Sequence, residues 1–291
     1  MTMPISCKVL EAIGRNQALQ PCVYCDPMWN AIQAEALAET ESDSALKPWL
    51  EDCVLRHRSI EASLGYVLGK KLCPGEPMML QQELVAAISA EPAIRVAIIE
   101  DLRAIRTHDP ATSSYLTPFL LFKGFLALEA YRLAHWLWKN ERSMFARRIQ
   151  SRVSEVFGVD IHPAASVGHG VFIDHATGVV IGESAVVGNG VVMLHGVTLG
   201  GTGKESGNRH PKVGDGVLIG AGAQILGNIR IGDSAKIGAG STVVTSVPVG
   251  ATVVGVAARE VHRKSVSGAP EPLVAIGQIP NNASALSPAI Q

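Results

Sequence analysis

Residues that can take up, give up or hold a proton gather in one part of this chain. Within about fifty residues lie two aspartates, five histidines and an arginine: Asp160, His162, His169, Asp174, His175, His195, Arg209 and His210. An imidazole can accept the proton of a hydroxyl group, while a carboxylate at its second nitrogen fixes the tautomer and stabilises the cation. Asp160 and His175 are candidates for such a pair. The planar guanidinium of Arg209 suits a substrate carboxylate.

His162 and His169 are interpreted differently, as polar surface residues. A further group consists of small residues that leave the backbone uncovered, which suits a long, narrow ligand. They are Gly201, Thr202, Ala221 and Ala239, with the glycines on either side of the two alanines. The same glycines and alanines could equally be corners that the fold requires. Both interpretations stay open at this point.

An aliphatic residue that returns every six positions predicts the scaffold that carries these groups. The repeat runs first through Ile161, Val167, Ile173, Ile181, Val187, Met193 and Leu199, then through Val213, Ile219, Ile225, Ile231, Ile237 and Val243. A period of six fits neither an α-helix nor the simple alternation of an ordinary strand. It is typical of a parallel β-helix, in which short strands meet at tight corners and stacked aliphatic side chains fill a narrow interior.

Two interruptions of the repeat mark places where function needs to reach beyond flat faces. Two residues are extra after Ile173, and the next repeat position follows Leu199 only after fourteen residues, which predicts a polar loop over 200–212. One coil takes three hexapeptides. We therefore expect His175 and His195 to stack on one face, about 4.8 Å apart.

The chain as a whole is predicted to be an α+β protein. A flexible arm over residues 1–27 precedes an all-helical domain over 28–158, and a β-helix domain follows over 159–260, before a disordered tail over 261–291. The tail is rich in Pro, Ala, Ser and Asn, a composition that does not form a packed core.

Within the helical half, three local signals predict where helices start and stop. A loop holds Asp109, because this residue precedes a proline and is displaced from the helical region. Thr117–Pro118 predicts the N-cap and first turn of a helix that runs toward Lys139. The last helix is expected to stop at Gly158, directly before the β-helix.

Bulk properties exclude some classes of function. A net charge of −1 and a pI near 6.8 give no attraction to nucleic acid or to anionic membranes. The most apolar stretch, residues 119–138, is interrupted by charged residues and is not expected to span a membrane. Five cysteines, an odd count in a long chain, favour a cytoplasmic location. Cys22 and Cys25 are interpreted as loop thiols rather than a redox or zinc site.

Six motifs make the chain resemble the serine O-acetyltransferases. They are Val159–Ala164, Ile173–Gly178, Val197–Lys204 and Arg209–Lys212 in the solenoid half, with Arg106–Ala111 and Lys123–Arg132 in the helical half. The resemblance implies a left-handed parallel β-helix with an extruded loop. It also implies transfer of acetyl from acetyl-CoA, a co-substrate, to the hydroxyl of L-serine in cysteine biosynthesis. No permanently bound cofactor and no metal are implied.

The resemblance also implies roles for individual residues. His175 would be the general base and Asp160 would orient it. The family's serine-binding residues match Asp109, Asp174, Arg209 and His210, and its coenzyme A contacts match Gly201, Thr202, Ala221 and Ala239. Asn208 stands where an Asp commonly precedes the Arg-His pair.

Partners follow from the same resemblance. Members of the family form trimers or dimers of trimers with sites between neighbours, and L-cysteine inhibits many of them at the serine site. Many also end in an isoleucine that docks into O-acetylserine sulfhydrylase. Here Ile290 is followed by Gln291, so we expect that docking to be weaker.

Two other functions compete with the acetyltransferase. A metal-dependent β-helix enzyme of the carbonic-anhydrase type would use His175, His195 and His210 as three zinc ligands with a water as the fourth. A non-catalytic scaffold would use only the solenoid face and the tail, and the Asp160–His175 pair would then be incidental.

Overall fold

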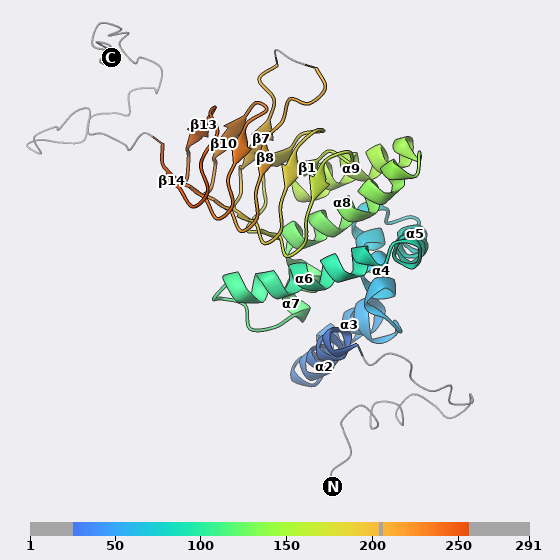
Figure 1. The fold of residues 1–291 in the computed structure, drawn as a ribbon. Coiled ribbons are helices and arrows are strands. Elements are labelled where there is room, and N and C mark those ends of the chain that lie inside the picture. The colour runs from blue at the N-terminus through green and yellow to red at the C-terminus, as the bar shows by residue number, and fades with distance from the viewer. Residues whose placement is uncertain (1–25, 204–205, 256–291) are drawn as a thin grey trace, which may run out of the picture. The chain divides into compact units, whose positions relative to one another are not determined.

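The computed structural model describes residues 26–203 and 206–255. It shows helices followed by a left-handed parallel β-helix with an extruded loop, as predicted (Figure 1). The pair Cys22 and Cys25, nearly all of the predicted arm, the predicted tail and the Ile290–Gln291 end lie outside the described residues.

The N-terminal part is helical up to Phe157. Its helices are α2 (Pro27–Ser42), α3 (Lys47–Leu50), α4 (Ile60–Leu72), α5 (Pro77–Ala90), α6 (Ala93–His108), α7 (Leu116–Leu121), α8 (Lys123–Lys139) and α9 (Ser143–Phe157), with a 3₁₀ turn at Ser44–Leu46 and a π turn at Glu51–Leu55. Asp26 and Ser59 cap α2 and α4 through their side chains. As predicted, α6 ends before the extended Asp109, and α9 ends at Gly158, whose φ is 67°.

The prediction of a single helix from Thr117–Pro118 to Lys139 is wrong, although a helix does begin at Leu116 with Pro118 in its first turn. The segment forms two helices, α7 and α8, with the extended residue Phe122 between them. The Glu35 carboxylate on α2 caps α7, since it accepts hydrogen bonds from the amides of Tyr115 and Leu116 at 2.9 and 2.7 Å. The cap from Glu35 comes from another helix and leaves no signal in the local sequence, whereas Ser114 Oγ is a local cap that accepts from the amide of Thr117 at 3.2 Å.

The C-terminal part is a triangular solenoid of short strands. They are β1 (Val159–Ile161), β2 (Ser166–Val167), β3 (Phe172–Ile173), β4 (Val179–Ile181), β5 (Val186–Val187), β6 (Val192–Met193), β7 (Thr198–Gly200), β8 (Lys212–Val213), β9 (Leu218–Ile219), β10 (Gln224–Leu226), β11 (Arg230–Ile231), β12 (Lys236–Ile237), β13 (Thr242–Val243) and β14 (Thr252–Val253). Parallel pairing orders them into the sheets β1-β4-β7-β10-β13, β2-β5-β8-β11 and β3-β6-β9-β12-β14.

The six-residue repeat fills the interior of this solenoid. All of its aliphatic positions are buried except Val167, which is half-buried. Its glycines answer two different demands. At Gly220 an added Cβ would lie 2.5 Å from the amide nitrogen of Ala239 in the next coil, whereas Gly222 adopts a left-handed conformation with φ 70°. The conformational demand was foreseen from the sequence, but the close approach of successive coils was not.

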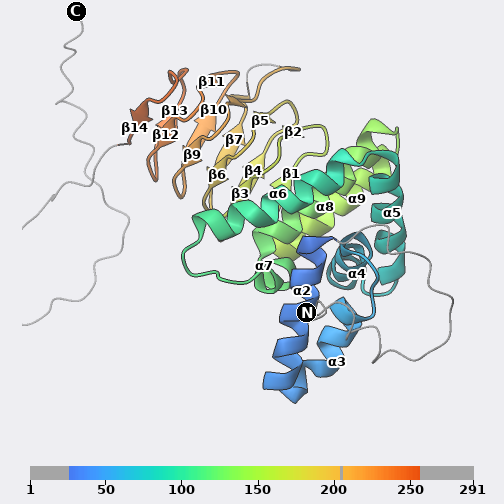
Figure 2. The same ribbon diagram turned by 60° about the horizontal axis from the view of Figure 1, so that its bottom comes forward.

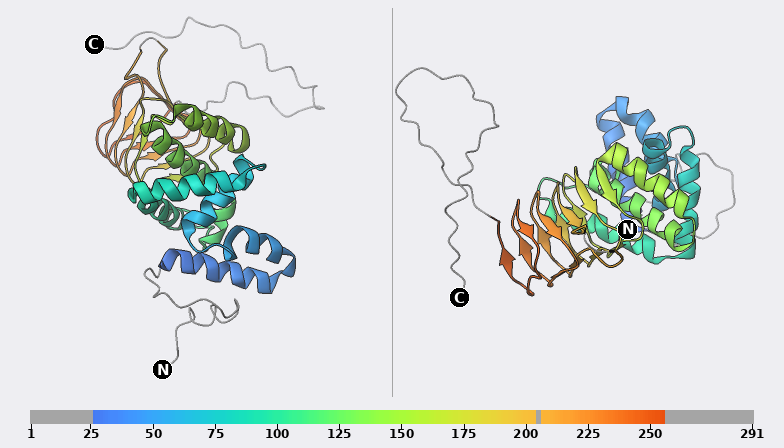
Figure 3. Two further views of the ribbon diagram at one scale, coloured as in Figure 1. Left: turned by 90° about the vertical axis from the view of Figure 1, so that its right-hand side faces the viewer. Right: turned by 90° about the horizontal axis from the view of Figure 1, so that it is seen from above.

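Helices α6, α8 and α9 gather at the end of the solenoid that holds β1 to β3 (Figures 2 and 3). Tyr131, Arg132 and His135 on α8 each bind a backbone carbonyl of the first coil, the last two at 2.8 and 2.7 Å. The first coil of the solenoid has no coil before it to pair with, and such an edge presents unpaired backbone groups. Helix α8 covers part of this edge and supplies hydrogen-bond donors to it.

A buried charge cluster fastens the same junction. Asp101 on α6 is fully buried; its Oδ2 accepts a hydrogen bond from Arg132 Nε at 2.9 Å, and its Oδ1 accepts one from the amide of Val171 at 2.7 Å. Glu129, also fully buried, lies 3.4 Å from Arg132. Among residues 26–203 and 206–255, no helix is long and apolar enough to cross a membrane.

Candidate active site

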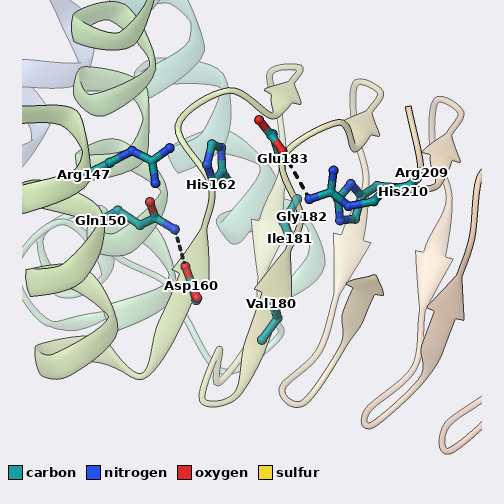
Figure 4. Close-up of a pocket in the computed structure, with 10 residues that line it drawn as sticks. All are labelled: Arg147, Gln150, Asp160, His162, Val180, Ile181, Gly182, Glu183, Arg209 and His210. Carbon is teal, nitrogen blue, oxygen red and sulfur yellow. Dashed lines mark hydrogen bonds and ion pairs between the residues drawn. The ribbon is translucent and has the colours of Figure 1, made fainter. Parts of the chain in front are cut away.

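A pocket of about 380 Å³ opens between α9 and the turns that follow β1 and β4 (Figure 4). It is lined by Arg147, Gln150, Asp160, His162, Val180, Ile181, Gly182, Glu183, Arg209 and His210. We call the turns after β1, β4 and β7 the loop corner, because the loop over 200–212 leaves the solenoid there. Three predicted site residues, Asp160, Arg209 and His210, therefore meet at one place.

The returning end of the loop is held by charged and polar contacts. The Arg209 guanidinium donates a hydrogen bond to the Glu183 carboxylate at 3.2 Å, which leaves the arginine beside the pocket. Lys212 Nζ donates to Asn208 Oδ1 at 2.6 Å. Asn208, which replaces the commoner aspartate, thus still supplies an acceptor oxygen for this lysine.

Both imidazoles of the pocket accept a hydrogen bond at Nδ1. The amide of Ala164 donates to His162 at 3.1 Å, and the amide of Ser184 donates to His210 at 3.2 Å. A nitrogen that accepts carries no proton, so each neutral ring holds its proton on Nε2. Burial lowers the pKa of both histidines, and the charge of Arg209 lowers the pKa of His210 further. The two rings are therefore neutral N–H donors near pH 7.

Helix α9 positions the carboxylate of Asp160 (Figure 4). The helix is amphipathic, with Ile149 and Val153 buried against the core. Gln150, next to this apolar stripe, donates from Nε2 to Asp160 Oδ1 at 2.7 Å. The amide thus fixes the direction in which this carboxylate on β1 points.

The two residues inserted after Ile173 form a tight turn that presents His175 to solvent. His175 and Ala176 both adopt left-handed conformations, with φ of 55° and 54°, which costs on the order of 1–3 kcal/mol for each such residue. The amide of Ala176 donates to the carbonyl of Asp174 at 2.6 Å. The His175 side chain is 78% exposed, and its Nε2 lies 3.9 Å from Asp174 Oδ1. Strained backbone of this kind is concentrated at functional sites.

His175 and His195 stack in neighbouring coils, as predicted, through the pairing of β3 with β6. Their ring centroids are 6.2 Å apart, more than the predicted 4.8 Å, because the rings meet edge to face at 84°. The same register places Ala221 and then Ala239 at this position in the next two coils. We call this column of turns, after β3, β6, β9 and β12, the histidine corner.

The helical part supports the histidine corner. Lys123 at the start of α8 donates to Thr177 Oγ1. Gly124 lies so close to the carbonyl of Ile173 that an added Cβ would be 2.0 Å from its oxygen. Helix α6 also packs against β3, and Asp109 directly follows this helix. The Asp109 carboxylate accepts a hydrogen bond from the amide of Ala111 at 2.9 Å.

The predicted site residues divide between the two corners. The loop corner carries Arg209 and His210 with Gly201 and Thr202, beside Asp160 on β1, and the histidine corner carries Asp174, His175, Ala221 and Ala239. The strands of the sheet β1-β4-β7-β10-β13 lie between them, a span of roughly 16 Å for five extended residues. No hydrogen bond or ion pair joins Asp160 with His175 in the described part of the chain.

The zinc alternative finds no support in this arrangement. It requires His210 to join His175 and His195, but within one copy of the chain His210 lies at the loop corner. Within residues 26–203 and 206–255, no group of three His, Cys, Asp or Glu side chains is arranged to hold a metal ion.

Some pocket residues were not foreseen from the sequence. His162 was interpreted as a surface residue, but it lines the pocket and lies edge-on to Trp138, with ring centroids 5.2 Å apart. The sequence could have indicated this, because His162 follows β1 at the same corner from which the loop over 200–212 leaves two coils later. Arg147, Gln150 and Glu183 gave none, because their roles depend on contacts between distant segments.

Comparisons with known proteins identify the family of the chain. A family model described as serine acetyltransferase, N-terminal, matches residues 28–130, and a bacterial transferase hexapeptide model matches residues 210–245. Probable serine acetyltransferase 4 of Oryza sativa subsp. japonica is 54% identical over 245 residues, which cover 83% of this chain and 78% of that protein. The chain belongs to the serine acetyltransferase family.

Solved structures of serine acetyltransferases have the same fold, each with a TM-score of 0.77. The soybean enzyme complexed with serine is 53% identical and covers 80% of this chain and 96% of its own. The enzyme of Brucella abortus strain S19 in complex with coenzyme A is 46% identical, with coverages of 82% and 97%. A serine acetyltransferase in complex with cysteine is also 46% identical, with coverages of 80% and 98%.

Proposed function

We propose that this serine acetyltransferase family member transfers the acetyl group of acetyl-CoA to the hydroxyl of L-serine, giving O-acetyl-L-serine and CoA. The observation that carries the proposal is the outward-facing His175 on its strained turn, in a chain that also places Arg209, whose guanidinium suits a carboxylate, beside a pocket. Soybean and Brucella relatives with serine and coenzyme A bound support the two substrates.

The proposed reaction assigns a task to each corner. Arg209 and the Nε2–H of His210 hold the serine carboxylate, and Asp109 and Asp174 face its ammonium group. His175 removes the proton of serine Oγ, which attacks the thioester carbonyl. The tetrahedral oxyanion then collapses, the C–S bond breaks, and the departing thiolate takes the proton from His175. The column above His175, ending in Ala221 and Ala239, gives the pantetheine arm a track with small side chains.

Thiol release tests this proposal directly. The protein is incubated with acetyl-CoA and, separately, L-serine, D-serine, L-threonine and no acceptor, and free CoA is measured. Release that depends on L-serine supports the proposal, and release that is independent of any acceptor overturns it. A chelator-treated sample tests the zinc alternative, since loss of activity that zinc restores would favour a metal site.

We also propose that the working site lies between two copies of the chain. Within one copy, Asp160 on β1 pairs with Gln150, and no hydrogen bond or ion pair joins it with His175 in the described residues. A cyclic trimer brings one corner of each copy against the other corner of the next, since a heterologous interface repeats around the axis. Pairing of two trimers through the helices would give the predicted hexamer.

Mixing two inactive variants tests the shared site. We expect His175→Ala and Arg209→Ala chains, unfolded together at equal amounts and refolded, to recover about one quarter of the parent's activity, since a quarter of the interfaces then combine two intact corners. Each variant refolded alone is the control. A mixture no more active than its components would place the complete site within one copy.

L-cysteine is the proposed inhibitor at the same site, because it differs from serine only by a thiol in place of the hydroxyl. The relative solved with cysteine supports this. We expect cysteine to raise the apparent KM for serine and to leave kcat unchanged at saturating serine. Inhibition that saturating serine fails to relieve would indicate a separate cysteine site.

We propose a cytoplasmic location on the evidence of the thiols. The chain has five cysteines, an odd count, and Cys53 and Cys73 are buried without a disulfide between them. This use of cysteine is typical of a reducing compartment. An Arabidopsis thaliana relative, 49% identical over 243 residues, is named chloroplastic. Cell fractionation distinguishes the cytoplasm from an organelle.

A further inference from the structure

One hydroxyl group ties the solenoid to the returning end of its loop. Ser184 Oγ, in the turn after β4, accepts hydrogen bonds from the amides of Arg209 at 3.0 Å and His210 at 3.2 Å. It also lies 2.9 Å from His210 Nδ1. A serine hydroxyl has two acceptor lone pairs and one proton. Since both lone pairs face amides, the proton is left for His210 Nδ1.

The same residue binds His210 a second time through its backbone. The Ser184 amide donates to His210 Nδ1 at 3.2 Å, so two donors converge on this nitrogen. His210 is 6% exposed, and its ring lies over Gly182, where an added Cβ would be 2.1 Å from Nε2. The imidazole therefore has no room to turn, and Nδ1 is held as an acceptor. The ring proton is consequently on Nε2, beside the pocket.

We propose that Ser184 is a positioning residue that holds His210 as an Nε2–H donor facing the substrate carboxylate. The inference rests on the proposed serine acetyltransferase activity. It also assigns a negative role, because a nitrogen that already carries a proton does not take one from a hydroxyl. His210 is thereby a binding residue, and proton removal is left to His175.

The competing explanation is that Ser184 only fastens the loop. Fastening alone would affect stability and every function of the loop, with or without the imidazole. Positioning acts through His210 and affects serine binding selectively. A pair of matched variants and a double-mutant cycle separate the two explanations.

Ser184→Ala is expected to raise the KM for serine about tenfold, the effect of one hydrogen bond to a charged group, and to change kcat and the KM for acetyl-CoA much less. Ser184→Thr keeps the hydroxyl and should stay close to the parent. Ser89→Ala on α5 is the matched control, since its exposed hydroxyl donates only to the carbonyl of Val85, at 2.8 Å.

The cycle repeats the measurement in a His210→Ala background. There Ser184→Ala is expected to cause no further rise in the KM for serine, since the group that it positions is gone. An equal rise in both backgrounds would overturn the inference and leave Ser184 as a fastening for the loop. The inference would also be overturned if the parent is active and Ser184→Ala has the same KM for serine as the parent. A parent without serine-dependent CoA release would overturn the proposed function, and this inference with it.

Discussion

Replacing His175 with alanine is expected to lower kcat by about 10²–10⁴-fold, the usual cost of losing a general base. The methyl group of alanine cannot accept the serine proton. A water molecule can enter the exposed turn, but it is not held in position to replace the imidazole as the base. The backbone conformation should survive, because alanine already occupies the next left-handed position, Ala176. Steady-state kinetics on the refolded, size-checked protein measure the effect.

Two further variants make this result specific. His169→Ala, on a turn away from both corners, should leave kcat close to the parent value. Asp160→Asn should cost less than His175→Ala, since the imidazole remains and loses only its charged partner. If His195→Ala abolished turnover while His175→Ala retained most of it, the base would be the second histidine of the stack.

The solenoid was predictable because its signal is local and repeated. Each buried aliphatic, such as Ile219, stands six residues from the next, and a turn follows each one, so period and burial coincide along the chain. The break after Leu199 was equally visible, since a loop interrupts the count. The position of His175 on a turn that projects from the solenoid was predictable for the same reason, because two residues are inserted there into a regular coil.

The pocket was only half predictable. Arg209 and His210 stand out by type, but Gln150 and Arg147 reach the pocket from α9, and only the packing of that helix on β1 brings them there. The Asp160–His175 pair shows a further limit. Both residues were identified from the sequence, yet within the described chain Asp160 lies on β1 and His175 lies in the turn before β4, with no hydrogen bond or ion pair between them. Their meeting is a property of the assembly that we propose.

Arg132→Met is expected to lower the free energy of unfolding by about 3–5 kcal/mol, because it leaves the fully buried Asp101 carboxylate without its cation. The same change removes the hydrogen bond to the carbonyl of Gly168 in the first coil. Urea denaturation at matched protein concentration measures the loss. Arg142→Met is the control. Its pair with Glu83 is bidentate at 2.7 Å but solvent-exposed, so the loss should stay below about 1 kcal/mol.

Replacing Glu129, the third member of the buried charge cluster, is expected to stabilise the protein at high pH rather than destabilise it. Burial, reinforced by the charge of Asp101, holds the pKa of Glu129 well above its usual range, so the folded protein keeps a proton that the unfolded chain loses as pH rises past about 4.5. The stability contributed by Glu129 is therefore present at low pH and lost as pH rises. Glu129→Gln removes that loss, and its unfolding free energy relative to the parent should be higher at pH 8 than at pH 5. A variant that is instead weakened most at pH 8 would show that Glu129 is ionised and stabilises the fold as a partner of Arg132.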